Sequence, residues 1–364
     1  MHRRLLVWFD RHRRDLPWRL TKDPYRVWIS EMMLQQTQVA TALPYYEKFL
    51  AAFPTVRRLA AAKLDDVLRH WAGLGYYARA RNMHRTAKMI VEELGGKFPS
   101  NREGLLKLPG IGPYSAAAIA SIVYDEPAAV VDGNVIRVIS RLFGVRKDVT
   151  SIDGKRAITG WADALIPTKR CGDFNQAMME LGATVCLPGN AARCDDCPLN
   201  GNCRALAAGA VARLPLKRKR IKVTNEVHVV AAVRRGRRWL AVQRPQNGLW
   251  GGLWELPTAV AGETAPRSLA ADIAMRWTNR RSAPHAIRFC RLDRLLSHRR
   301  IRFVGYRFEA NANHSPGNGK TAQKVTEQQK AQWLTLGQLR TLPMSTAMQA
   351  VVRELEQATA LQKA

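Results

Sequence analysis

In residues 1–205, apolar residues recur every three to four positions, as on one face of an α-helix. Helix start and stop signals separate one such helical segment from the next. Asp23 followed by Pro24 is a typical N-cap and first residue of a helix, and Pro44 is expected to end that helix. The next helix is expected to begin after Pro54. The pattern therefore predicts a module built of consecutive helices.

Two further signals mark helix ends in this module. The helix that follows Pro54 is expected to run to Gly73, because glycine is common at helix C-termini. Ser100 and Glu103 stand at the spacing of a capping box before an apolar run. We therefore expect Ser100 to cap another helix.

After a basic connector at residues 206–224, the pattern changes to that of an α+β domain. Apolar and polar residues alternate along 226–245, with a turn at RRGR, and this pattern predicts a β-hairpin. The pattern of residues 301–310 predicts another strand. Residues 268–277 read as a short helix, and Ser345 is expected to cap a last helix that ends near residue 358.

The chain is thus expected to have two domains. A mainly α domain at 1–205 precedes a basic connector at 206–224, which ends in consecutive basic residues, and a smaller α+β domain at 225–358. Residues 311–330 are expected to be locally disordered.

The stretch Trp28–Ala40 reads as one mostly apolar helix that carries an acid and several amides. In a continuous helix, Glu31, Gln35 and Gln38 share one face. An acid on such a helix is either a buried polar group with a partner or part of a functional site.

The charge balance of the chain is strongly basic. Lys and Arg number 58 against 29 Asp and Glu, a formal net charge of +29. This excess indicates a polyanionic partner, nucleic acid before membrane, although the Arg-rich composition of a GC-rich genome also produces it. No apolar run reaches the length of a membrane span, and the N-terminal residues lack a signal-peptide core, so an intracellular, reducing compartment is expected.

Residues 108–120, LPGIGPYSAAAIA, place Gly110 and Gly112 on either side of one apolar residue, between two helical segments. This pattern is typical of a helix–hairpin–helix, in which backbone N–H groups at the start of the second helix bind a phosphate. Glycine allows the DNA backbone to approach closely. An ordinary corner between helices remains the alternative.

Asp132, in VVDGN, follows an apolar run and precedes a helical pattern. It is either the N-cap of that helix or an acid that acts together with Glu31. The phosphate-binding hairpin shortly before it favours the second interpretation.

Four of the six cysteines, Cys186, Cys194, Cys197 and Cys203, lie within 18 residues. In a reducing compartment such a group holds a metal more often than disulfides. Four thiolates in one loop hold a 4Fe–4S cluster or a tetrahedral zinc, and the presence of a single C-x2-C pair favours the cluster. The other two cysteines are expected in the core.

Together these segments resemble the endonuclease III superfamily of base-excision DNA glycosylases and, within it, the MutY-type adenine DNA glycosylases. The matching motifs follow the family's order over almost the whole chain: RDLPWR at 14–19, WISEMMLQQTQV at 28–39, GLGYYARARN at 73–82, LPGIGPYSAAAIAS at 108–121, VVDGNVIRV at 130–138, FNQAMMELGATVC at 174–186 and GLWGGLWELP at 248–257.

The resemblance implies an enzyme that flips adenine, mispaired with 8-oxoguanine or guanine, out of the duplex and cleaves its N-glycosidic bond in base excision repair. Glu31 would be the acid that protonates adenine, and Asp132 the carboxylate that stabilises the cationic sugar, supported by Tyr114 and Asn134. Bifunctional relatives have a lysine at the position of Tyr114, so a monofunctional glycosylase without strong lyase activity at abasic sites is implied.

The resemblance also assigns contacts to DNA and to the base. Gln36 and Tyr76 would fill the gap that the flipped base leaves in the stack. Arg14, Trp18 and Gln176 would line the adenine pocket.

The domain at 225–358 resembles the Nudix-like domain with which MutY-type proteins recognise 8-oxoguanine. The family's Phe-Ser-His reads here as Leu296-Ser297-His298, so the hydrogen-bonding pair is kept and the aromatic residue is replaced. The glutamate-rich helix of Nudix pyrophosphatases is absent, so nucleotide hydrolysis is not expected. The loop at 186–203 would hold a 4Fe–4S cluster, with a first cysteine spacing one residue longer than is usual.

The expected partner is double-stranded DNA that contains A:8-oxoguanine or A:G mispairs, bound by a cytoplasmic monomer that associates with the bacterial nucleoid and not with membranes. Two other functions stay open. One is a bifunctional, endonuclease III-like glycosylase for oxidised pyrimidines. The other is a non-catalytic DNA-binding protein, which would leave Glu31 and Asp132 unexplained.

Overall fold

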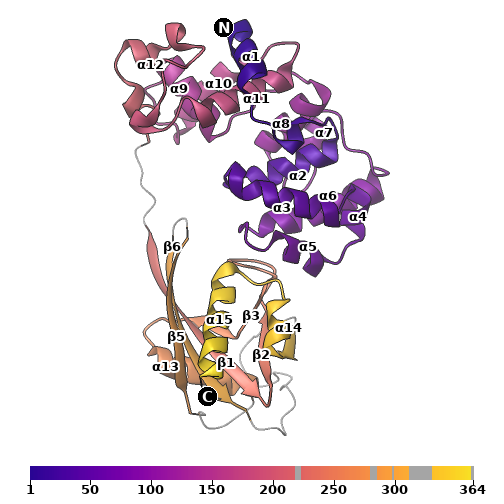
Figure 1. The fold of residues 1–364 in the computed structure, drawn as a ribbon, viewed down its shortest axis with the longest axis vertical. Coiled ribbons are helices and arrows are strands. Elements are labelled where there is room, and N and C mark those ends of the chain that lie inside the picture. The colour runs from indigo at the N-terminus through magenta and orange to yellow at the C-terminus, as the bar shows by residue number, and fades with distance from the viewer. Residues whose placement is uncertain (218–222, 279–284, 297–298, 311–329, 362–364) are drawn as a thin grey trace. The chain divides into compact units, whose positions relative to one another are not determined.

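The structure is a computed structural model that describes residues 1–217, 223–278, 285–296, 299–310 and 330–361 (Figure 1). The chain forms two compact units. Unit 1 comprises residues 1–61 and 82–220, and unit 2 comprises residues 62–81 and 221–364. Within the described residues, no helix has the length and apolar character needed to cross a membrane.

Unit 1 is built from helices, most of which are linked by short loops. They are α1 (His2–His12), α2 (Pro24–Leu34), α3 (Val39–Ala52), α4 (Val56–Ala61), most of α6 (Ala78–Glu93), α7 (Arg102–Leu106), α8 (Pro113–Tyr124), α9 (Gly133–Leu142), α10 (Ile152–Leu165), α11 (Cys171–Thr184) and α12 (Arg204–Ala207), with 3-10 turns η1 (Pro17–Arg19), η2 (Gly189–Ala191), η3 (Asn200–Asn202) and η4 (Val211–Arg213).

One apolar cluster joins helices that are distant in the sequence. Phe9 of α1, Ile139 of α9 and Phe174 of α11 are buried together. Helix α8 packs between α2 and α11. Helix α11 is thereby fixed between the N-terminal helix and the hairpin helix, and this packing sets the walls of the cleft described below.

The start of α2 confirms the predicted cap, but its end corrects a prediction. Asp23 accepts a hydrogen bond from the backbone N–H of Tyr25 at 2.9 Å, and Pro24 is the first helical residue. The helix ends at Leu34, because Gln36 adopts a left-handed conformation with φ of 57°. The prediction that the helix continues to Pro44 was wrong.

Two predictions that depended on this helix are also wrong: Pro44 does not end a helix, and the predicted shared face does not form. Helix α3 begins anew at Val39 and contains Pro44, so Glu31, Gln35 and Gln38 do not share one helix face. Gln35 follows the last residue of α2, and Gln38 precedes the first residue of α3.

Two other helix boundaries differ from the predictions. The run after Pro54 forms two helices, α4 and α5 (Leu64–Trp71), because Lys63 adopts an extended conformation and starts the second helix. The cap of α7 is Asn101, whose side chain accepts the N–H of Gly104 at 2.8 Å. The predicted capping box at Ser100 is therefore wrong by one residue.

Unit 2 contains a mixed seven-stranded sheet of order β3-β2-β1-β6-β5, with β4 paired to β1 and β7 paired to β2. Its elements are α5, β1 (Thr224–Arg235), β2 (Arg238–Gln243), β3 (Trp254–Glu255), β4 (Thr258–Val260), α13 (Pro266–Thr278), β5 (Ile287–Leu295), β6 (Arg299–Glu309), β7 (Ala331–Leu334), α14 (Leu336–Arg340) and α15 (Thr346–Ala360). Strands β1 and β6 are parallel, and the other pairs are antiparallel.

Successive side chains of β1 point to opposite sides of the sheet, and both sides are apolar. Val230 and Ala232 pack with residues of α15, whereas Val229, Ala231 and Val233 pack with residues of α13. The two helices therefore cover opposite faces of the sheet (Figure 1).

Several predictions for unit 2 are confirmed. Strands β1 and β2 form the predicted hairpin, with Arg235 opposite Arg238 across the turn. Ser345 caps α15 by accepting the N–H of Met348 at 3.1 Å. The predicted pattern of a mainly α module followed by an α+β domain is also confirmed.

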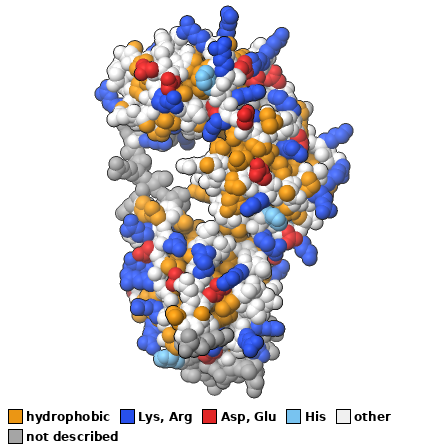
Figure 2. Space-filling view, viewed as in Figure 1, with side chains coloured by type: hydrophobic (Ala, Val, Ile, Leu, Met, Phe, Trp, Pro, Cys, Tyr) orange, Lys and Arg blue, Asp and Glu red, His pale blue; other side chains and the backbone are white. Residues whose placement is uncertain are grey.

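Part of the expected connector is packed. Leu214 is buried with Ala205 and Ala210, so the first part of the expected connector packs within unit 1. The stretch expected to be disordered, 311–330, lies outside the described residues except for its last residue. Figure 2 shows Lys and Arg side chains over the visible face of both units, with fewer acidic side chains among them.

Candidate active site

Unit 1 contains a cleft of about 680 Å³ between α2, α11, the first residues of α8 and α9, and the loop after α1. Many of the predicted functional residues meet here although they come from distant parts of the chain. Those that line the cleft are Arg14, Trp18, Glu31, Gln36, Tyr114, Asp132, Asn134 and Gln176.

Glu31 lies in the wall of this cleft and is only 4% exposed. The hydroxyl of Tyr114, from the first turn of α8, donates a hydrogen bond to Oε2 of Glu31 at 2.8 Å. Burial raises the pKa of Glu31 to about 7; the hydrogen bond from Tyr114 and the charge of Arg19 oppose this rise, and the charge of Asp132 adds to it. Glu31 is therefore a carboxyl group that can be protonated at neutral pH.

Asp132 is at the same time an N-cap and a residue of the cleft. Its Oδ1 accepts the backbone N–H of Val135 at 2.7 Å at the start of α9, and its Oδ2 accepts the side-chain N–H of Asn134 at 2.9 Å. Burial raises the pKa of Asp132 above its ordinary value, and these hydrogen bonds and the charge of Arg137 offset only part of the rise. The N-cap interpretation is confirmed, and Asp132 lines the same cleft as Glu31.

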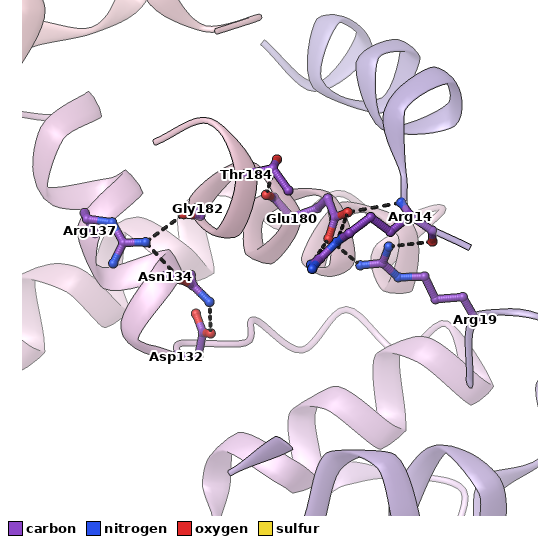
Figure 3. Close-up of polar contacts among 8 residues, drawn as sticks. All are labelled: Arg14, Arg19, Asp132, Asn134, Arg137, Glu180, Gly182 and Thr184. Atoms are coloured by element: carbon purple, nitrogen blue, oxygen red, sulfur yellow. Dashed lines mark hydrogen bonds and ion pairs between the residues drawn. The ribbon is translucent and has the colours of Figure 1, made fainter. Parts of the chain in front are cut away.

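Arg137 connects the Asp132 end of the cleft to the cysteine loop, and Figure 3 shows its contacts with Asn134 and Gly182. Its Nη2 donates to Oδ1 of Asn134 at 2.8 Å and to the carbonyl oxygen of Gly182 at 2.7 Å. Its Nε donates to the carbonyl oxygen of Cys186 at 2.7 Å. Gly182 is required here, because a Cβ at this position would lie 2.5 Å from the Cβ of Asn134.

A third carboxylate, Glu180 of α11, was not predicted. It is buried and accepts hydrogen bonds from the backbone N–H and the guanidinium of Arg14 and from the guanidinium of Arg19 (Figure 3). Burial alone would raise the pKa of Glu180, but the hydrogen bonds from Arg14 and Arg19 lower it to about 2. The signal in the sequence is its spacing of four residues from Gln176, which places both on one helix face.

The two adjacent glutamines after α2 have different surroundings. The Nε2 of Gln35 donates to the hydroxyl of Ser115 at 3.0 Å, whereas Gln36 is exposed and lines the cleft. Tyr76, the other predicted wedge residue, belongs to unit 2, where its side chain is exposed.

Trp18 and Gln176, expected to contact the base, are both buried in the cleft wall. The ring of Trp18 meets the ring of Tyr46 edge to face, with centroids 5.1 Å apart. An indole held this way forms a fixed apolar surface in the cleft that Gln176 also lines.

The predicted hairpin lies between α7 and α8, and its two glycines differ in their roles. Gly110 has φ of 76°, and a Cβ there would lie 2.5 Å from the Cβ of Asn82, so this position is restricted by packing as well as by conformation. Gly112 precedes the first residue of α8, and a Cβ there would meet open space. The start of α8 is thus open to a phosphate at Gly112.

The four clustered cysteines, Cys186, Cys194, Cys197 and Cys203, line one small cavity and form no disulfide. Burial, together with the other three cysteines, raises the pKa of Cys197 to about 11. In the described part of the chain, no group of three or more His, Cys, Asp or Glu is arranged to hold a single metal ion.

Arg141 fixes the loop that carries these cysteines. Its guanidinium is buried and donates to the carbonyl oxygen of Leu187 at 2.7 Å, to the carbonyl oxygen of Leu214 at 3.1 Å and to Sγ of Cys186 at 3.3 Å. A cation buried this way stabilises negative charge on the sulfur beside it.

The remaining predicted residues, Ser297 and His298, lie outside the described residues. Leu296 before them packs partly buried against the α15 face of the sheet.

Comparison with known proteins gives consistent matches. Residues 29–162 match the HhH-GPD superfamily of base excision DNA repair proteins, and residues 228–354 match the NUDIX domain. The chain is 36% identical to the adenine DNA glycosylase of Homo sapiens, over 96% of this chain and 72% of that protein. It is 38% identical to the adenine DNA glycosylase of Buchnera aphidicola subsp. Schizaphis graminum, over 68% of each chain.

A solved structure supports the fold of unit 1. A thermostable thymine-DNA glycosylase, 29% identical, superposes with a TM-score of 0.52 and covers 57% of this chain and 95% of that chain.

Proposed function

The chain belongs to the adenine DNA glycosylase family, and from this premise we propose that it removes adenine mispaired with 8-oxoguanine or guanine from double-stranded DNA. The observation that carries the proposal is the pair of carboxyl groups in one cleft. Glu31 is buried and readily protonated, and Asp132 is held by N–H donors. Cleavage of an N-glycosidic bond needs one group of each kind.

Glu31 is the proposed acid. A proton transferred to N7 of the flipped adenine allows the electron pair of the N9–C1′ bond to leave with the base. Tyr114 holds the carboxyl group in place through its 2.8 Å hydrogen bond. The proposed aromatic and amide contacts to the base come from Trp18 and Gln176.

Asp132 is the proposed stabiliser of the cationic sugar that remains until water adds to C1′. Both of its oxygens accept N–H groups, which favours the ionised form. Asn134 and Arg137 keep the carboxylate in one orientation. This pairing of a neutral acid with a nearby carboxylate is what an oxocarbenium-like transition state requires.

The proposed enzyme is monofunctional. A lyase reaction needs an amine that forms a Schiff base with the sugar. Among the described residues that line the cleft there is no lysine, and Tyr114 occupies the position where bifunctional relatives carry one. The phosphodiester is therefore expected to stay intact after the base has left.

The DNA contacts are proposed from three features. The open N-terminus of α8 at Gly112 would bind a phosphate, and Gln36 and Tyr76 would replace the flipped base in the stack. Ser297 and His298 of the Nudix-like domain would hydrogen-bond the 8-oxoguanine.

The function is tested by measuring adenine release with the full chain in excess over the duplex. With adenine opposite 8-oxoguanine or guanine, we expect one free adenine per duplex and a strand that breaks only after alkali; an A:T duplex should release none. The rate opposite 8-oxoguanine should fall toward the rate opposite guanine when Ser297 and His298 are both replaced by Ala. Release of an oxidised pyrimidine instead of adenine, or strand breakage without alkali, would contradict the proposal.

We also propose that the four clustered cysteines hold a 4Fe–4S cluster. Four thiols around one cavity match the donor set of such a cluster. The role proposed for the cluster is to fix the loop whose Cys186 carbonyl accepts the hydrogen bond from Arg137.

The purified protein is therefore expected to be brown and to contain about four iron atoms and four sulfide ions per chain. Cys197→Ser should lose most of this iron, whereas Cys171→Ser, at a buried cysteine outside the group, should keep it. One zinc per colourless chain would exclude the cluster.

A further inference from the structure

The proposed chemistry uses Glu31 and Asp132 and leaves the third carboxylate of the cleft without a role. The Glu180 side chain is only 1% exposed and lines the cleft. Its Oε1 accepts from Nε of Arg14 at 2.8 Å, and its Oε2 accepts from Nη2 of Arg14 at 2.7 Å and from Nη2 of Arg19 at 2.8 Å. A carboxylate with this many charged donors is fixed in both position and charge.

The charged and titratable groups around Glu31 come from four helical elements and one loop. Tyr114 of α8 donates to it, and Asp132 lies at the start of α9, on the same helix as Arg137. Arg19 of η1 and Arg14 of the preceding loop line the same cleft. Glu180 of α11 bonds to both of these arginines.

These groups shift the pKa of Glu31 in opposite directions. The charge of Asp132 raises the pKa of Glu31, and the charge of Arg19 lowers it. An unneutralised Arg19 would thus favour the ionised form of Glu31, which has no proton to transfer. Such effects are strong in this wall of the cleft, because buried charges are poorly screened by water.

Glu180 supplies the neutralising charge. An oxygen 2.8 Å from Nη2 of Arg19 turns that cation into one side of an ion pair, whose field falls off much faster than that of a lone charge. Hydrogen bonds from the two arginines keep the pKa of Glu180 near 2, so its charge is constant over the whole working range of pH.

We propose that Glu180 is a positioning residue that offsets the positive charges of Arg14 and Arg19 and thereby keeps Glu31 protonated before the reaction. The inference rests on the proposed function, because it needs Glu31 to be the acid. It adds a residue that acts on the acid through the arginine it pairs with, Arg19.

The test is the pH dependence of single-turnover adenine release from an A:8-oxoguanine duplex, measured from pH 5 to pH 9 with the full chain in saturating excess. The wild-type rate should fall as the pH rises through the pKa of Glu31, since the ionised form is inactive. In Glu180→Gln this fall should begin about one pH unit lower, because the charge of Arg19 then acts on Glu31 unopposed.

Arg19→Gln should shift the pH profile in the opposite direction. Loss of one positive charge beside Glu31 should move the fall to higher pH than in the wild type. Glu180→Asp keeps the charge, so its fall should stay at the wild-type pH even if the overall rate drops. Glu93→Gln, an exposed position near the end of α6, is the matched control and should not move the profile.

The proposal is overturned if Glu180→Gln keeps the wild-type profile, or if Arg19→Gln shifts the fall in the same direction as Glu180→Gln. If Glu180→Gln does not fold, as judged by circular dichroism, Arg19→Gln and Glu180→Asp still decide between the two outcomes. Failure of the function itself looks different: Glu31→Gln would then share the wild-type rate and profile.

Discussion

Glu31→Gln is expected to lower the single-turnover rate of adenine release by about 10²–10⁴-fold, the range typical for loss of a general acid. The amide has nearly the shape of the carboxyl group, and its oxygen can still accept the 2.8 Å hydrogen bond from Tyr114. What is lost is the proton that the buried carboxyl group carries at neutral pH. The fold of α2 and the affinity for the duplex should therefore stay close to those of the wild type.

The measurement combines adenine release with binding. Excess protein is mixed with an A:8-oxoguanine duplex, free adenine is counted over time, and the bound fraction is followed by fluorescence anisotropy. Glu93→Gln makes the same chemical change at an exposed position of α6 and should keep the wild-type rate. A rate for Glu31→Gln within a few-fold of wild type, at equal binding, would remove Glu31 from the reaction.

Asp132→Asn is expected to lower the same rate by about 10²–10³-fold, as is typical when one electrostatic stabiliser of a transition state is removed. Asparagine is as good an N-cap as aspartate, so its Oδ1 can still accept the N–H of Val135 and α9 should keep its start. The substitution thus removes the negative charge near the sugar and leaves the cap.

Asp23→Asn is the matched control for this prediction. Asp23 caps α2 in the same way, by accepting the N–H of Tyr25, and it does not line the cleft. If the loss in Asp132→Asn came from helix capping alone, both variants would show similar rates and melting temperatures. A large loss of rate in Asp132→Asn only, with both melting temperatures unchanged, is the expected result.

Sequence reasoning identified the chemical groups of the cleft better than the course of the backbone between them. Glu31 could be singled out as an acid in an apolar helix, and Asp132 through its place between the hairpin and a helix start, whereas Tyr114 was identified only through the family resemblance. The end of α2 was missed, since it depends on a left-handed glutamine, Gln36, and this conformation is read from sequence only at Gly or Asn. The cap of α7 at Asn101 was missed by one residue because Ser100 matches the capping motif equally well.

Local pattern places Glu180 on the helix face of Gln176 but does not identify its partners. Glu180 lies in an apolar helix, where an acid is expected only with a partner, and its partners Arg14 and Arg19 are about 160 residues away in the chain. The link from Asn134 through Arg137 to Cys186 is also a long-range arrangement. Contacts of this kind follow from how α9 and α11 pack, and the periodicity of either helix alone does not predict them.

The two proposed roles require Glu31 and Asp132 to be in opposite protonation states, and the pH dependence of the wild-type rate tests this most directly. With burial raising the pKa of Glu31 to about 7, single-turnover adenine release should fall about tenfold for each pH unit above that value. On the acid side the rate should fall as Asp132 takes up its proton, at a pH above the ordinary range for aspartate. A rate that is flat from pH 6 to pH 9, or that increases as the pH rises through 7, would contradict a protonated Glu31 as the acid.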